Sequence, residues 1–407
     1  MARILWACWD GGGNLPPSLG IATELDRRGH QVSFHGRHNM VPRARAAGVT
    51  AYAFEQALTD QEAFSFHPLV SVFGYCASPA VGEELVDLVA TEEPDLVVID
   101  AMFGAALDVA PRLQRPTAVM VHTFLYRGID AWQGNLAMQS DSRKRAGFRG
   151  LDDLDVLWGE RDRVHVNTLA SYDGAPTVPW SNIVHGAPVL GGDPRAVPVT
   201  LPWDVDHPDP LVLLSFSTVP EQRSAESLQR ALDALSSLPV RVVATTGGIV
   251  EVDELDAPAN AYVVEVADDD ALLAQASLVV GHGGHGTTMR TLRAGLPLVG
   301  MPAKGTDQAS NLHLVEQLGA GRFQRHGGPV GVGRGQSRAG LDVQHHHLGP
   351  GNVGRRTQES HGGRSDQSQA NKRQDQPFVP EQGQENVTNP DAGLLVGLRR
   401  RRRPGSL

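Results

Sequence analysis

The sequence has few cysteines and no long apolar runs, and each absence excludes a class of protein. Cys8 and Cys76 are the only cysteines among 407 residues, so the chain lacks the disulfide framework of a small secreted domain and fits a reducing cytoplasm. No apolar run approaches the ~20 residues that span a bilayer. The opening segment MARILWACWD lacks the long apolar region and the cleavage site of a signal peptide. We therefore expect a cytoplasmic protein with no stable membrane insertion.

Positive charge is also scarce. The formal net charge of -10 argues against nucleic-acid binding by the body of the chain. Five consecutive arginines at 399–403 are the one place where an anionic surface could bind, but a solvated tail without function is the simpler interpretation. We predict no nucleic-acid partner, and the sequence leaves the oligomeric state open.

Apolar runs alternate regularly with helical segments along residues 1–322. Continuous runs such as RILWAC, DLVVID and LVLLSF predict parallel strands that are buried on both faces. A Pro- and Gly-rich stretch at 191–210 is typical of a linker. The sequence therefore predicts an α/β protein of two tandem Rossmann-like, doubly wound domains, at 1–190 and 211–322, with a cleft between them.

The character of the chain changes after Arg322. Residues 323–407 have no sustained apolar periodicity and are rich in Gly, Gln and Arg, a composition that predicts a disordered tail. Because the change is abrupt, our hypothesis is a reading-frame shift or a truncation of the coding sequence. The domain at 211–322 would then be incomplete, and the activity of this particular chain would be in doubt.

The segment VVGHGGHGTT, residues 279–288, joins a buried strand to a helix that we predict to open at Thr287–Thr288. Free N–H groups and a partial positive charge at a helix N-terminus attract phosphate, and glycines let the phosphate approach the backbone. A threonine there caps the helix or donates its hydroxyl to the anion. A phosphate site and a simple turn are both compatible with this segment.

Two further interpretations of this loop are weaker. Gly281, Gly283 and Gly286 match the dinucleotide pattern G-x-G-x-x-G, but the loop follows the fourth strand of its domain and the next strand ends without an acid. His282 and His285 have the spacing of a zinc pair, but no third ligand lies nearby in the sequence. We therefore predict that this chain holds no metal.

The stretch HGGHGTTMRTLRAGLPLVGMPAKGTDQASNLHLVEQLGAG, residues 282–321, closely resembles the donor-binding signature of nucleotide-sugar-dependent glycosyltransferases of the GT-B fold. The resemblance is to family 1, of the actinobacterial macrolide and glycolipid type, and extends more weakly to residues 13–34. It implies an inverting, metal-independent transfer of a sugar from a UDP- or dTDP-sugar to a hydroxyl of a hydrophobic small molecule or lipid. No cofactor is implied beyond the nucleotide-sugar co-substrate.

The same resemblance implies a set of donor-binding residues. The loop would hold the diphosphate, the pair at 307–308 would bind sugar hydroxyls, and the pair at 217–218 would make a second phosphate contact. A strand-end turn for 217–218 and a helix cap for Asp307 remain alternatives. The implied residues are Ser217, Thr218, His282, Gly284, Gly286, Thr287, Thr288, Asp307 and Gln308.

The catalytic base expected from the resemblance is missing. Members of the family use an N-terminal-domain His, oriented by an Asp, to take the proton of the acceptor hydroxyl. The matching position here holds Asn14, whose amide is not a base, while Asp100 matches the orienting Asp. Asp10, His122 or Asp100 itself could take over, or a phenolic acceptor would need less help. We favour Asp10, with an Asx turn as its structural alternative.

Aromatic residues of the first domain could line the pocket for a hydrophobic acceptor, although ordinary core packing would account for many of them. They are Phe64, Phe66, Phe73, Tyr75 and Trp132. Because the base is missing, two alternatives to an active enzyme remain open. The chain could be a non-catalytic relative that binds sugar nucleotides, or an inactive, truncated glycosyltransferase.

Overall fold

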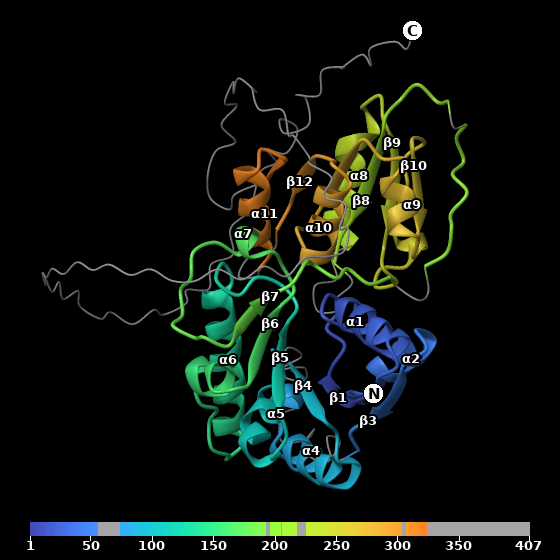
Figure 1. Ribbon diagram of the computed structural model, residues 1–407. Coiled ribbons are helices and arrows are strands. Elements are labelled where there is room, and N and C mark those ends of the chain that lie inside the picture. The colour runs from blue at the N-terminus through green and yellow to red at the C-terminus, as the bar shows by residue number, and fades with distance from the viewer. Residues whose placement is uncertain (56–73, 193–195, 205, 218–224, 303–306, 324–407) are drawn as a thin grey trace, which may run out of the picture. The chain divides into compact units, whose positions relative to one another are not determined.

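Two parallel sheets organise the part of the chain that the computed structural model describes (Figure 1). The described residues are 1–55, 74–192, 196–204, 206–217, 225–302 and 307–323. They all belong to one compact unit, Met1–Gly328, and the remaining unit, Pro329–Leu407, lies outside the described residues. Of the predicted tail at 323–407, only Phe323 is among the described residues, where it ends a strand, and the tail stays a prediction.

The first sheet has the strand order β3-β2-β1-β4-β5-β6-β7. Each of its neighbouring strand pairs is parallel. Its strands are β1 Arg3–Cys8, β2 Gln31–Gly36, β3 Thr50–Ala53, β4 Leu96–Asp100, β5 Thr117–Val121, β6 Arg163–Val166 and β7 Ile183–His185. Its helices are α1 Leu15–Arg27, α2 Met40–Ala46, α4 Pro79–Glu92, α5 Gly104–Val109, α6 Ile129–Arg145 and α7 Ala170–Asp173, with short turns η2 Ala110–Arg112 and η3 Asp155–Gly159.

The second sheet has the order β10-β9-β8-β11-β12-β13, again with parallel neighbours. Its strands are β8 Leu211–Ser215, β9 Arg241–Thr245, β10 Ala261–Val264, β11 Leu278–Gly281, β12 Leu298–Gly300 and β13 Gly321–Phe323. Its helices are α8 Ala225–Ser236, α9 Asp269–Leu273, α10 His285–Arg293 and α11 Gln308–Gln317, with the short turn η5 Val252–Glu254.

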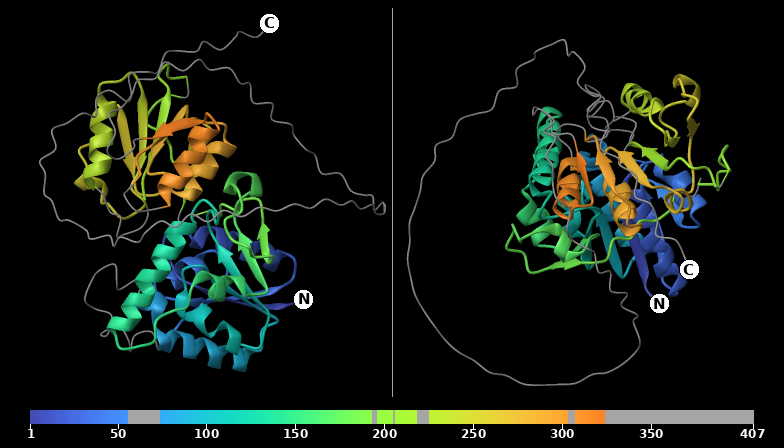
Figure 2. Two further views of the ribbon diagram at one scale, coloured as in Figure 1. Left: turned by 90° about the vertical axis from the view of Figure 1, so that its left-hand side faces the viewer. Right: turned by 90° about the horizontal axis from the view of Figure 1, so that it is seen from above.

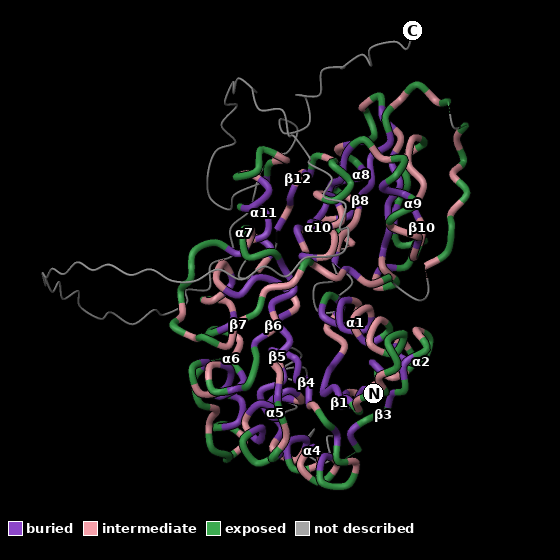
Figure 3. Tube along the Cα trace, viewed as in Figure 1, coloured by how far each residue is buried: buried purple, intermediate pink, exposed green. Residues whose placement is uncertain are grey.

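Both faces of the first sheet are covered, as the continuous apolar runs predict. In β1, Leu5 and Ala7 belong to a core that includes side chains of α4 and α5. Ile4, Trp6 and Cys8 point into a separate core with α1 and α2. Because successive strand residues point to opposite faces, a strand buried on both sides must be apolar at every position. Figure 3 shows the resulting burial along the strands.

The second sheet is covered in the same way. Leu211 and Leu213 of β8 pack in one core with side chains of α9 and α11. The helix α8, yellow-green in the left view of Figure 2, lies on the opposite side of the sheet from the orange α11. The predicted fold class, two doubly wound parallel sheets, is confirmed. The predicted domain boundaries at 190, 210 and 322 stay predictions.

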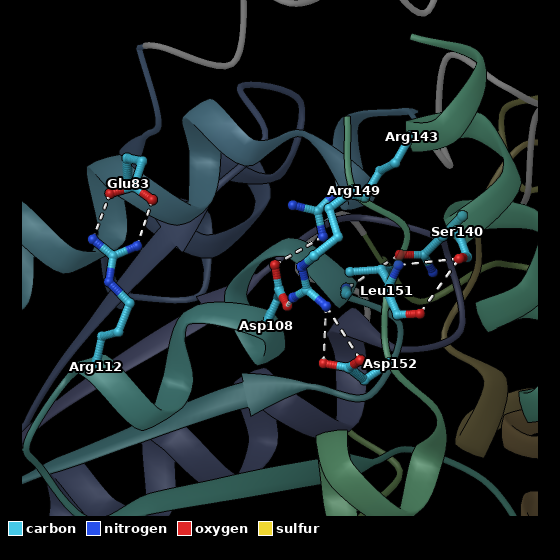
Figure 4. Close-up of polar contacts among 10 residues, drawn as sticks. Glu83, Asp108, Arg112, Ser140, Arg143, Arg149, Leu151 and Asp152 are labelled. Atoms are coloured by element: carbon cyan, nitrogen blue, oxygen red, sulfur yellow. Dashed lines mark hydrogen bonds and ion pairs between the residues drawn. The ribbon is translucent and has the colours of Figure 1, made fainter. Parts of the chain in front are cut away.

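An ion-paired cluster ties the helices of the first sheet together (Figure 4). Arg143 of α6 is buried and donates to Asp108 of α5 at 2.9 Å. Arg149 bridges Asp108 and Asp152, and the Ser140 hydroxyl accepts from the Leu151 N–H at 3.0 Å. These contacts fix the chain that follows α6. No helix among the described residues is long and apolar enough to cross a membrane.

The sheet packing makes a prediction for Gly36, the last residue of β2. A Cβ at Gly36 would overlap the carbonyl oxygen of Cys8 in the neighbouring strand. We expect Gly36→Ala to lower the free energy of unfolding by about 3 kcal/mol, measured by urea denaturation. The control is Gly134→Ala on α6, where a Cβ meets no atom within 4 Å and should stabilise the helix by up to about 1 kcal/mol. Equal effects of the two substitutions would refute the close approach.

Candidate functional site

The strand order places the predicted residues at the two points where it reverses. β1 and β4 are neighbours although they are not consecutive in the chain, and the same is true of β8 and β11. In doubly wound sheets, ligands bind at the carboxyl ends of the strands beside such a reversal. Asn14 follows β1, Asp100 ends β4, Ser217 follows β8 and His282 follows β11.

Asn14 and Asp100 are in direct contact. The Nδ2 of Asn14 donates to Oδ2 of Asp100 at 2.9 Å and to the Trp9 carbonyl at 2.8 Å, while its Oδ1 accepts from the Gly11 N–H at 2.9 Å. Asp100 is fully buried, and its Oδ1 accepts from the Trp9 indole at 3.1 Å and the Met102 N–H at 2.9 Å. Every oxygen of the carboxylate is thus satisfied by a neutral donor. The pair has the arrangement of a base and its orienting acid, with an amide in place of the base.

Asp10, the base that the sequence favours, has a structural role. Its Oδ1 accepts from the Gly12 N–H at 2.9 Å, which is the Asx turn weighed above as the alternative. Arg43 of α2 donates to both carboxylate oxygens at 2.8 Å. Both carboxylate oxygens of Asp10 are thus held by neighbouring groups. A catalytic role for Asp10 stays a prediction, and these contacts argue against it.

The helix after β11 begins two residues earlier than predicted. The sequence places the start at Thr287–Thr288, but α10 begins at His285, with Gly284 as its N-cap. The Thr288 N–H already donates to the Gly284 carbonyl at 2.9 Å. The prediction was wrong because Gly286 is helical and Gly284 begins the helix without a capping side chain. The first-turn N–H groups, including those of Gly286 and Thr287, lack acceptors within the helix.

Glycine is required at two positions of this loop. Gly283 has φ +85°, and a Cβ there would come within 2.6 Å of Leu312 on α11. A Cβ at Gly284 would come within 2.5 Å of Nε2 of His282, so the His282 ring lies over the N-terminus of α10. At Gly286 a Cβ would meet no atom within 4 Å, which leaves open space beside the free N–H groups.

The His282 imidazole is neutral at pH 7. Burial lowers its pKa to about 4, and the Ser215 carbonyl offsets part of the shift. Its Nδ1 is buried without a hydrogen-bond partner, and its ring lies nearly parallel to that of Phe216, with centroids 6.4 Å apart. A neutral imidazole beside a helix N-terminus can donate a hydrogen bond to an anion, and a bound anion would raise its pKa.

The remaining predicted donor residues lie near the loop or the following helix. Asp307 is the N-cap of α11, but its side chain makes no capping bond, so the predicted cap is not formed. Burial raises the pKa of the Asp307 carboxyl, while His122 opposes the shift. Gln308 and Ser217 are buried. Thr218 lies outside the described residues.

The two loop threonines differ. Thr287 is half-buried, and its carbonyl accepts from the Thr291 hydroxyl at 2.7 Å. Thr288 is fully buried, and its Oγ1 has no hydrogen-bond partner. Among the described residues no three His, Cys, Asp or Glu side chains are placed together to hold a metal ion. The predicted metal independence of the reaction is not tested by that absence.

Asn311 escaped the sequence analysis, and His285 was considered there only as a possible zinc ligand. Asn311 of α11 donates from Nδ2 to the Gly283 carbonyl at 2.8 Å and so fixes the loop between β11 and α10. Its position four residues after Asp307, on the same helix face, was the available signal. His285, to which no role was given, is buried, and its ring meets that of Phe124 edge-on with centroids 5.4 Å apart. Burial lowers the pKa of His285 to about 3, and His122 adds to the shift.

Of the aromatic residues predicted for an acceptor pocket, two are among the described residues, Tyr75 and Trp132. Phe64, Phe66 and Phe73 lie outside the described residues. Tyr75 packs against Phe103 in the core, with ring centroids 5.7 Å apart. Trp132 of α6 is buried, and its indole donates to the Phe124 carbonyl at 2.8 Å. Core packing therefore accounts for both visible residues, and the pocket stays a prediction.

Comparison with known families supports the resemblance drawn from the loop. Residues 221–326 match the model of the glycosyltransferase family 28 C-terminal domain. A PGL/p-HBAD biosynthesis glycosyltransferase of Mycobacterium tuberculosis is 36% identical over 110 residues, which cover 27% of this chain and 25% of that protein. A PGL/p-HBAD biosynthesis rhamnosyltransferase of Mycobacterium bovis is 38% identical over 124 residues, or 30% of this chain and 26% of the relative. The chain thus matches about a quarter of the length of these relatives.

Likeness over a longer stretch is weaker in sequence and clear in fold. The 4'-demethylrebeccamycin synthase of Lentzea aerocolonigenes is 25% identical over 73% of this chain and 82% of its own length. The solved calicheamicin glycosyltransferase has a TM-score of 0.59 at 21% identity, covering 80% of this chain and 86% of that one. A glycosyltransferase solved in complex with dTDP has a TM-score of 0.58 at 18% identity, covering 79% and 86%. These likenesses confirm the predicted GT-B fold and the glycosyltransferase resemblance.

The contacts of Asn14 predict a structural penalty for its removal. Asn14→Ala withdraws one donor from the buried Asp100 carboxylate and one from the Trp9 carbonyl. We expect a loss of about 3 kcal/mol in the free energy of unfolding at pH 7, because a buried charge is left under-solvated. The measurement is urea denaturation, with the exposed Asn39→Ala as control at under about 0.5 kcal/mol. Similar values for the two variants would contradict this account of Asn14.

The burial of His285 predicts a pH dependence of stability. Its folded-state pKa of about 3 lies below the ordinary value of 6.5, so the stability that depends on the neutral ring is present above pH 6.5 and is lost as the pH falls toward 3. Between pH 7 and pH 5 we expect the unfolding free energy of the native chain to fall by about 2 kcal/mol more than that of His285→Gln. Urea denaturation at both pH values measures this difference. The exposed His313→Gln should keep the native pH dependence, and an unchanged dependence in His285→Gln would count against the burial of a neutral ring.

Proposed function

From a GT-B fold that carries a family 28 C-terminal match, we propose that the chain transfers a sugar from a UDP- or dTDP-sugar to a hydroxyl of a hydrophobic acceptor. The observation that carries the proposal is the junction of β11 and α10. There the His282 ring lies over a glycine-rich helix N-terminus whose first N–H groups have no acceptor within the helix. The geometry suits a diphosphate, since the backbone is open where the phosphate oxygens would lie.

The loop would bind the diphosphate as follows. Its two phosphates would accept from the first-turn N–H groups of α10, in the open space beside Gly286. His282 would donate from its neutral ring. During transfer, negative charge builds up on the departing diphosphate, and fixed dipoles directed at it stabilise the transition state. We therefore propose a reaction that needs neither a metal ion nor a further cofactor.

The sugar would lie at the start of α11. Asp307 and Gln308 follow β12 and precede or begin the helix that also supplies Asn311. The Asp307 carboxyl makes no capping bond and can accept from a sugar hydroxyl. A structural neighbour solved with dTDP supports a pyrimidine nucleotide donor. An inverting course and a cytoplasmic location complete the proposal.

One observation favours a second candidate function, a sugar-nucleotide-binding protein without turnover. Asn14 stands where a base would pair with Asp100, and its amide is fully engaged in internal hydrogen bonds. The donor loop would still bind nucleotide in such a protein. Release of nucleotide diphosphate from a sugar donor, with or without an acceptor, separates an enzyme from a binding protein.

A charge introduced at Gly286 tests the phosphate loop. Gly286→Asp fits without steric conflict, so the variant should fold. Its negative charge would lie where the diphosphate binds. We therefore expect its affinity for UDP or dTDP to fall at least about 10-fold, or about 1.4 kcal/mol. Isothermal titration calorimetry measures the affinity. Gly134→Asp on the exposed side of α6 is the control for added charge, and EDTA should leave binding unchanged. The proposal fails if the native chain binds neither nucleotide, or if Gly286→Asp binds as well as Gly134→Asp.

A further inference from the structure

The segment that follows β5 holds a histidine with an unused nitrogen. His122 comes directly after Val121, the last residue of β5, and its Nδ1 is buried without a hydrogen-bond partner. The edge of the His122 ring meets Trp132 of α6, with centroids 5.5 Å apart and planes at 85°. The Trp132 indole is itself held by the Phe124 carbonyl at 2.8 Å. The imidazole is therefore fixed in orientation while one of its nitrogens is left over.

The same segment contacts the helices of the donor loop within the compact unit. Phe124 packs in a small apolar cluster with Met289 of α10 and Leu314 of α11. Three residues later, the Arg127 carbonyl accepts from the Ser310 hydroxyl at 3.1 Å. The Arg127 guanidinium donates to the Gln317 side chain at 2.7 Å. These contacts bring the segment that follows β5 against α10 and α11.

The titratable groups that face His122 come from these two helices. Burial is the main cause of the lowered pKa of His285 on α10 and of the raised pKa of Asp307 at the start of α11, and His122 acts electrostatically on both groups. Asp307 is the residue proposed to bind a sugar hydroxyl. His122 thus lies beside the sugar position, although it belongs to the other sheet.

Buried polar atoms without partners collect around this point. Besides His122 Nδ1, they are His285 Nε2, Thr288 Oγ1 and Asn311 Oδ1. They come from the segment after β5 and from the helices α10 and α11. Buried polar groups in native proteins are almost always paired, so such a group of orphans marks a place where a polar ligand supplies the missing partners.

The side chains of the other candidate bases are engaged in hydrogen bonds or ion pairs. Both oxygens of Asp10 are held by Arg43, and both oxygens of Asp100 accept from neutral donors in the core. Asn14 carries no basic atom. Of the candidates drawn from the sequence, His122 alone has a basic atom without any hydrogen-bond partner. With the ring proton on Nε2, Nδ1 is an acceptor.

We propose that His122 is the base of the transfer reaction and takes the acceptor's proton at Nδ1. This rests on the proposed function. The acceptor oxygen forms a bond to the anomeric carbon as its O–H bond breaks and its proton passes to Nδ1. The bond from the anomeric carbon to the diphosphate oxygen breaks, and its electron pair leaves with the nucleotide diphosphate. The His122 proton then passes to water. Trp132 is a positioning residue for the ring.

The experiment compares two acceptor classes on the full chain, a phenol and an aliphatic alcohol. A base contributes about 100- to 10,000-fold to a rate, and matters most when the nucleophile is weakly acidic. In His122→Gln we expect kcat for the alcohol to fall at least about 100-fold and kcat for the phenol to fall much less. Nucleotide affinity should stay unchanged, and the exposed His313→Gln should retain native rates. In His122→Ala, added imidazole should restore turnover of the alcohol.

The possible results separate this inference from the proposed function. Equal losses for phenol and alcohol, or no rescue of His122→Ala by imidazole, would overturn the role of His122 while leaving nucleotide binding intact. Native rates in His122→Gln would overturn it as well. Failure of the native chain to bind UDP or dTDP would instead overturn the proposed function, and calorimetry reads that result separately from the rates.

Discussion

The constraint on which the structure depends is that every central strand is buried on both faces. Such a strand cannot return through a tight hairpin, because both of its faces must be covered by helices, and so each strand leads into a helix and then into a parallel neighbour. All carboxyl ends of a sheet therefore meet at one edge. Where the order reverses, between β1 and β4 and between β8 and β11, the helices diverge and leave polar loops side by side.

The two reversal points are used differently. Beside β1 and β4 the polar groups satisfy one another, since Asn14, Trp9 and the Met102 N–H surround the buried Asp100 carboxylate. A buried charge held only by neutral donors is stable while every donor is present. Beside β8 and β11 the glycines keep the backbone open, and His282 retains a nitrogen without a partner. The polar groups at the first point are therefore paired with one another, whereas the second point keeps a His282 nitrogen without a partner.

The sequence predicted what depends on local pattern and missed what depends on distant neighbours. The buried strands and the glycine-rich loop after β11 were readable because apolar runs and glycines act over a few residues. The ion pair of Asp10 with Arg43, 33 residues away, was not readable, and it changes the role expected for Asp10. The start of α10 was misplaced because Gly286 adopts helical geometry in its first turn, although glycine is normally unfavourable in helices. The neighbours of His122 on α10 and α11 follow only from tertiary packing.

These differences bear on how a glycosyltransferase fold would operate with an amide at position 14. An amide that donates to Asp100 preserves the turn after β1 and the satisfaction of the carboxylate, so the fold does not depend on a base there. Proton transfer requires only that some lone pair reach the acceptor hydroxyl, since geometry rather than chain position defines a base. His122 projects from a strand two places along the same sheet, next to Asp307. An amide in place of a base at position 14 would therefore move the proton-transfer step to another residue of the site and leave the donor loop unchanged.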